Sequence, residues 1–140
     1  MLTLDLAQMM VQTAVARARA AGMKPLSVVV LDARAAVVAV ATEDGASLKR
    51  FEIARGKAAG ALAFNVGSRA LGVMATERPH FLAGAAHVVG GLVPVAGGVL
   101  IRAADGAVLG AVGVSGETSD NDEAVAVAGI VAAGLLADGG

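Results

Sequence analysis

The stretch GGVLIRAADGAVLGAVGVSGETSDNDEAVAVAG, residues 97–129, decides the fold. Two apolar runs, 97–102 and 107–114, flank the turn residues Ala104-Asp105-Gly106, and an Asp-Gly turn between such runs predicts a β-hairpin. Acidic residues then open an apolar segment, which predicts a helix over about 119–136, since carboxylates favour the first turn of a helix. A hairpin followed directly by a helix indicates a mixed α and β fold.

Upstream, the N-terminal residues extend this pattern. Thr3 can cap a helix whose apolar positions recur at helical spacing until Gly22. Residues 26–32 and 37–42 are rich in valine and predict two strands that pair as a second hairpin. The order of elements already favours an antiparallel sheet.

The middle of the chain is expected to be mainly helical. Ser47 can cap a helix that ends near Asn65, and a shorter helix is expected over 68–76. Proline, glycine and histidine interrupt residues 78–91, so a loop is expected there, with a helical turn near Phe81, and then a short strand over 91–95. The whole chain predicts one α+β domain over residues 1–140, an antiparallel sandwich with five strands and three or four helices.

Composition excludes several classes of function. The chain is 56% hydrophobic and 16% charged, with a net charge of −1, so it is not disordered and has no basic surface for nucleic acid. It contains no cysteine, which excludes disulfides and zinc–thiolate sites, and we expect no metal site. Its longest apolar stretch, residues 124–137, is shorter than the roughly 18–20 residues that a membrane span needs. We expect a cytoplasmic protein, and the sequence leaves open whether a signal peptide was removed.

The last predicted helix also bears on assembly. It has hardly a polar residue after Glu123, and a helix that is apolar all round must be covered on more than one side. In a domain of this size a second subunit is the simplest cover, so a homo-oligomer is expected. The alternative is a central helix buried within one chain.

Several motifs resemble the GlcG/HbpS-type haem-binding family, whose domain also forms the C-terminal part of PduO-type proteins. The matching segments are Gly97-Gly98, Asp105-Gly106, LGAVGVSG at 109–116, Asp122, Ala128-Gly129, and, nearer the N-terminus, VVLD at 29–32, DGAS at 44–47 and A-x-x-K-A at 54–58. The resemblance implies a profilin-like α-β-α sandwich with a five-stranded antiparallel sheet, homo-oligomers from dimers to octamers, and a haem or corrinoid ligand. The chain departs from the family pattern at Leu100, where proline is usual, and at Ala35-Ala36, where glycine is usual.

Candidate site residues are few. His80 and His87 are the only histidines, and imidazole is the usual haem ligand and general base, so both are candidate ligand-binding and catalytic residues. Met74 is a candidate second axial ligand. Arg55 and Lys57 are candidates for binding a carboxylate or a haem propionate.

Acidic side chains have simpler explanations. Asp32, at a strand end, is a candidate catalytic acid or base, but an Asp there more often bonds the backbone of its own turn. Four carboxylates, those of Glu117, Asp120, Asp122 and Glu123, crowd one helix start; they repel phosphate and fit a solvated acidic surface better than a cation site.

Three functions stay open from the sequence. The first is a small-ligand binding protein of the GlcG/HbpS type, for haem or a corrinoid. The second is an enzyme acting on a small organic acid, with a histidine as base and Arg55 or Lys57 holding the carboxylate. The third is an accessory protein whose oligomeric surface is its function.

Overall fold

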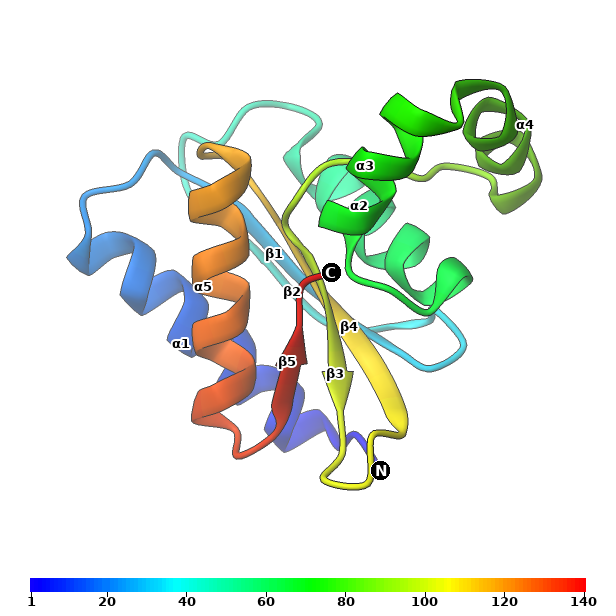
Figure 1. Cartoon of the computed structure of the whole chain (residues 1–140). Helices are drawn as coiled ribbons and strands as arrows, with labels where there is room; N and C mark the ends of the chain where they lie inside the picture. Colours follow the sequence, from blue (N-terminus) through cyan, green and yellow to red (C-terminus); the bar gives the residue numbers. More distant parts are fainter.

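The computed structural model describes residues 1–140 and has three layers, a central sheet with helices on both faces (Figure 1). One face is covered by α1 (Leu4–Ala20) and α5 (Ser119–Ala132), and the other by α2 (Arg50–Phe64), with α3 (Ser68–Glu77) and α4 (Pro79–Val89) beyond it. The strands are β1 (Ser27–Asp32), β2 (Val37–Thr42), β3 (Gly98–Arg102), β4 (Val108–Ser115) and β5 (Leu136–Asp138). The α+β class and the α-β-α sandwich are confirmed.

The sheet has the strand order β2-β1-β4-β3-β5, and every neighbouring pair is antiparallel, as predicted. The two central strands, β1 and β4, come from different hairpins and pair along their length, with Val28 opposite Val114. Both predicted hairpins form, and the second turns at Asp105-Gly106. Thr3 caps α1 as expected, because its hydroxyl accepts a hydrogen bond from the Leu6 N–H at 3.2 Å.

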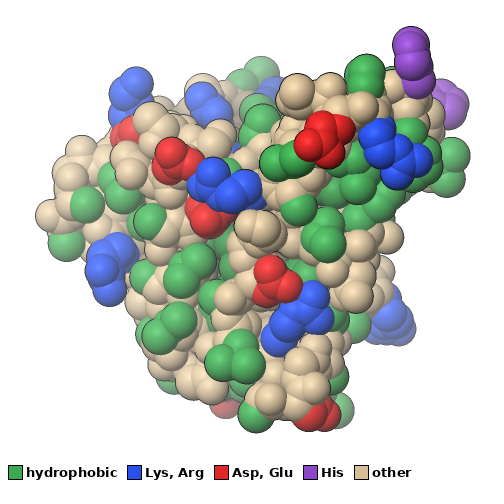
Figure 2. Space-filling model, viewed as in Figure 1, with side chains coloured by type: hydrophobic (Ala, Val, Ile, Leu, Met, Phe, Trp, Pro, Cys, Tyr) green, Lys and Arg blue, Asp and Glu red, His purple; other side chains and the backbone are tan.

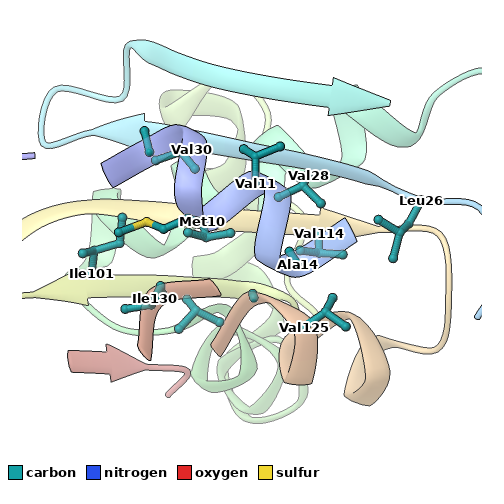
Figure 3. Packing of buried hydrophobic residues seen from close by; sticks show 14 of the residues in the cluster. Met10, Val11, Ala14, Leu26, Val28, Val30, Ile101, Val114, Val125 and Ile130 are labelled. Carbon is teal, nitrogen blue, oxygen red and sulfur yellow. The ribbon is translucent and has the colours of Figure 1, made fainter. Parts of the chain in front are cut away.

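Successive side chains of β1 point to opposite faces of the sheet, and the core is accordingly divided into two clusters. Val28 and Val30 point toward α1 and α5, where they join the larger cluster with Met10, Val125 and Ile130 (Figure 3). The other side of the strand belongs to the smaller cluster beneath α2, which contains Val29, Leu31, Ala54, Ala58, Ala61, Leu100 and Ala111. The strand is buried on both faces, which is why it is a continuous apolar run rather than an alternating one.

Glycines of β3 and β4 let α2 lie directly on the sheet. A Cβ at Gly113 would stand 2.0 Å from the Ala54 carbonyl oxygen, and one at Gly98 would stand 2.3 Å from that of Lys57. No side chain fits at such a distance. The small residues of this segment therefore serve helix–sheet contact.

Three sequence expectations are wrong in the middle of the chain. Most of residues 78–91 is not a loop: residues 79–89 form α4, because Pro79 takes the first helical position, where the missing N–H is no loss. Residues 91–95 form no strand. The helix α2 begins at Arg50 rather than after Ser47, whose hydroxyl instead accepts a hydrogen bond from the Arg50 Nε at 2.8 Å.

The C-terminal helix is also shorter than expected. It ends at Ala132, and Gly134 then takes a φ of 79°, a left-handed conformation that glycine adopts readily. The residues beyond it form β5 on the edge of the sheet. With α3 and α4 the chain has five helices rather than three or four, and none has the length and apolarity that crossing a membrane requires.

Candidate functional site

The largest hollow of the molecule lies against the outer side of α2. We call it the α2 hollow; its volume is about 720 Å³ and its wall consists of residues 33–35, 51, 52, 55, 56, 59, 62, 63 and 88–91. Three segments meet there: the β1–β2 turn, the exposed side of α2, and the C-terminal end of α4. The volume falls within the roughly 300–1,000 Å³ typical of small-molecule sites.

The wall of the α2 hollow contains both apolar side chains and positively charged ones. Phe51, Leu62 and Val89 are partly buried and apolar, whereas Arg34 and Arg55 are exposed and basic. Glu52 is the only acidic residue of the wall. Such a wall suits a molecule with a large apolar surface and carboxylate groups, because guanidinium binds carboxylate through paired hydrogen bonds.

The β1–β2 turn that holds Arg34 is stabilised by hydrogen bonds to Asp32. The Asp32 Oδ1 atom accepts hydrogen bonds from the backbone N–H of Arg34 at 2.8 Å and of Ala36 at 3.0 Å. The N–H groups of Ala36 and Arg34 lower the pKa of the Asp32 carboxyl below its usual value, so it is ionised at neutral pH. Asp32 thus bonds the backbone of its own turn, and nothing in this arrangement prepares it to take up a proton.

Neither histidine lines the α2 hollow, although His87 directly precedes the wall residue Val88. His80 and His87 are both on α4 and both exposed, and they project from the outer end of the molecule (Figure 2). Met74 of α3 packs against the cluster of Leu71, Leu82 and Leu92 between α3 and α4. Of the residues predicted to bind a ligand, the structure therefore places only Arg55 in this wall.

Lys57 is committed to another contact. Its side chain is 3% exposed, and its Nζ atom lies 3.0 Å from Asp122 Oδ2 and 3.0 Å from the Val114 carbonyl oxygen. The backbone N–H of Glu117 donates to the other Asp122 oxygen at 3.0 Å. The pair joins α2 to the start of α5 inside the molecule, and Lys57 does not face the hollow.

The acidic start of α5 is solvated only in part, since Asp120 is exposed whereas Asp122 is buried. Asp122 is buried, and Asp120 and Glu123 both pair with Arg69 of α3, at 2.6 and 3.0 Å. Glu117 accepts from the Lys24 N–H at 2.9 Å, which with the Thr118 N–H lowers the pKa of its carboxyl. No group of three or more acidic or histidine side chains is placed to hold a metal ion.

Sequence reasoning missed Arg34, Ala35 and Phe51 as parts of one wall. Nothing in the sequence brings them together, since the wall draws on three segments that are up to 58 residues apart, from Ala33 to Gly91. From the sequence, a basic residue in a hairpin turn such as Arg34 is expected to be an ordinary exposed side chain. Only the packing of α2 beside the turn shows what it faces.

Comparisons with known proteins find relatives that match nearly the whole chain. The family model described as haem degrading protein HbpS-like matches residues 2–131. The crystal structure of HbpS is 30% identical, with a TM-score of 0.82, and the alignment covers 94% of this chain and 89% of that chain. A double mutant of HbpS from Streptomyces reticuli is 29% identical, with a TM-score of 0.82 and coverage of 94% and 86%.

A complex of PduOC with haem is also similar. It is 26% identical, with a TM-score of 0.84, and the alignment covers 96% of each chain. A comparison with curated protein sequences finds no match.

Proposed function

The chain belongs to the family of haem-degrading proteins of the HbpS type, and we propose that it binds haem or a similar anionic tetrapyrrole in the α2 hollow. The observation that carries the proposal is the wall itself, where apolar side chains lie beside Arg34 and Arg55. A porphyrin has a flat apolar ring and carboxylate side groups, which match these two kinds of residue. The solved complex of the similar PduOC with haem supports the same ligand class.

The fit is to the ring and its carboxylates rather than to the iron. The wall of the α2 hollow contains no histidine, methionine, cysteine or tyrosine, the side chains that hold haem iron in proteins. Binding through this wall therefore relies on apolar contact and on the two guanidinium groups. We expect a metal-free porphyrin to bind about as well as the iron form.

Binding is favoured over catalysis on an organic acid. That reaction needs a base within about 3 Å of the proton it removes, or one water away, and beside the carboxylate-binding arginine. His80 and His87 lie outside the wall that contains Arg55, and the Asp32 carboxylate is held by its turn. No observation in the structure favours the enzymatic alternative.

The test is a titration with haemin and with metal-free protoporphyrin IX, followed by absorbance or fluorescence. We expect saturable binding of both, and a loss of about 10-fold or more in affinity for both on Arg55→Ala, since a hydrogen bond to a charged group contributes about 1.5–3 kcal/mol. The matched control is Arg17→Ala on α1, which removes the same charge from the other face of the sheet.

Two outcomes would overturn the proposed site. One is the absence of saturable binding by the unaltered chain. The other is haemin binding that survives Arg55→Ala but disappears on His80→Ala or His87→Ala, which would move the ligand to α4.

We also propose that the chain acts as a homo-oligomer. Its own fold covers much of α5, through α1 and the sheet, so the cover that this helix needs comes largely from one chain. Val131 of α5 and Leu136 of β5 nevertheless remain 59% and 53% exposed. A second copy covering α5 would remove Val131 from water. The cytoplasmic location expected from the sequence stays a prediction.

A further inference from the structure

The two hairpins of the sheet share one turn geometry. In the first, the Asp32 N–H donates to the Ala36 carbonyl and the Ala35 N–H to the Asp32 carbonyl, both at 2.9 Å. In the second, Ala103, Gly106 and Ala107 repeat this pattern at the same two distances. The strand register of the two hairpins is also the same. Each second strand has one unpaired residue next to the turn, Val38 in β2 and Leu109 in β4.

One position of this turn requires a left-handed backbone, which favours glycine. The second hairpin meets the requirement with Gly106, at a φ of 87°. The first has Ala35 there, at a φ of 64°, and is one of only two places in the chain where a residue other than glycine takes a positive φ. The other is Asn65, which ends α2, and asparagine tolerates this conformation.

The surroundings of the two positions differ. A Cβ at Gly106 would meet nothing within 4 Å, so glycine there is free of any packing role. Ala35 lies in the wall of the α2 hollow and, like Phe51 and Leu62, is partly buried against the core cluster beneath α2. The hydrogen bonds of Asp32 fix the turn and hold the alanine in its strained backbone conformation.

We propose that Ala35 is a ligand-binding residue of the α2 hollow and that its methyl group contacts the apolar face of the ligand. The proposal rests on the ligand class proposed above. Glycine would be less strained than alanine at this position of the turn, as Gly106 shows in the second hairpin. The presence of alanine at residue 35 therefore has to be explained by the contacts of its methyl group. Ala35 follows Arg34 in the wall of the hollow, on the side formed by the β1–β2 turn.

The experiment exchanges the two residues. Ala35→Gly should leave the urea midpoint of unfolding unchanged or raise it, because it relieves the backbone, and should weaken haemin binding about 4-fold, the factor for one methyl group withdrawn from apolar contact. Gly106→Ala is the matched control, which places the same methyl group in the same turn away from the hollow. It should lower the urea midpoint and leave haemin affinity unchanged.

Each result decides between roles. A lower urea midpoint for Ala35→Gly would overturn the proposal, since the methyl group would then be needed for folding. Unchanged haemin affinity for Ala35→Gly, with binding by the unaltered chain intact, would overturn it while leaving the proposed function standing. A failure of the unaltered chain to bind haemin overturns the proposed function, and this inference with it.

Discussion

Lys57 and Asp122 form the one ion pair of the chain in which both side chains are buried, being 3% and 1% exposed. Burial raises the pKa of the Asp122 carboxyl, and the Lys57 ammonium opposes that rise. Removing only the lysine would leave a carboxylate in the interior without its partner. Breaking a buried pair in this way costs more than replacing the pair as a whole.

We therefore expect Lys57→Met to lower the free energy of unfolding by about 3–5 kcal/mol at pH 7, measured by urea unfolding. The double variant Lys57→Met/Asp122→Asn should recover most of this loss, because the amide is neutral and its oxygen can still accept from the Glu117 N–H. A raised pKa favours the folded state at low pH, so the loss from Lys57→Met should shrink as the pH falls toward 4. Equal stability of Lys57→Met and the unaltered chain would contradict this account.

The Lys57–Asp122 pair also shows a contact that could not be predicted from the sequence. Asp122 stands among other acidic residues at a helix start, where a solvated position is the ordinary expectation. Lys57 lies 65 residues before it, on a different helix and a different face of the sheet. Only the close approach of α2 to the start of β3, beside Gly97, brings the two together.

Among the elements, those with strong local signals could be predicted. The Asp-Gly turn and the valine-rich runs correctly indicate both hairpins, and the Thr3 cap correctly indicates the start of α1. The helix α4 was not predicted, because its proline, glycine and histidine residues interrupt the apolar spacing typical of a helix. Pro79 nevertheless lies at the first helical position, where proline is tolerated. The three residues of β5 carry no pattern of their own and form a strand only because β3 offers a free edge.

The contact between α2 and the sheet gives a prediction for a whole element. Gly113→Ala should destabilise the protein by about 3 kcal/mol, because the new methyl group would overlap the Ala54 carbonyl oxygen and push α2 away from β4. Gly84→Ala on α4 is the control, since a Cβ there meets nothing within 4 Å and alanine favours a helix by about 1 kcal/mol over glycine. Thermal or urea unfolding of both variants tests this; a Gly113→Ala protein as stable as the parent would show that α2 can shift freely.

At the level of the molecule, the fold class could be predicted but the site only in part. Strand and helix order suffices for an α+β sandwich with an antiparallel sheet, and the family resemblance implies its α-β-α layers. Both hold despite the errors in the middle of the chain. The site depends on which segments meet, and the α2 hollow draws on a turn, a helix side and a helix end. Arg55 is a candidate from its residue type and its place on the second predicted helix, whereas the roles proposed for Arg34 and Ala35 depend on the position of the turn beside α2.

Assembly is the remaining question at this level, and Val131 tests it better than its neighbour Ile130. Ile130 is fully buried in the core of its own chain, so a charge there would unfold the protein whether or not it assembles. Val131 is 59% exposed on the same helix, so Val131→Asp should leave the circular dichroism spectrum intact. If a second copy covers this side, the charge would have to be buried at the contact, which costs several kcal/mol.

Light scattering should therefore give a mass above 13.6 kDa for the unaltered chain at micromolar concentration and a lower mass for Val131→Asp. Leu48→Asp, a control at an 88% exposed residue in the loop before α2, should keep the mass of the unaltered chain. A monomer for the unaltered chain would refute the assembly. An oligomer that persists in Val131→Asp would place the contact between copies elsewhere, because a charge within an apolar interface has no partner to offset its loss of water.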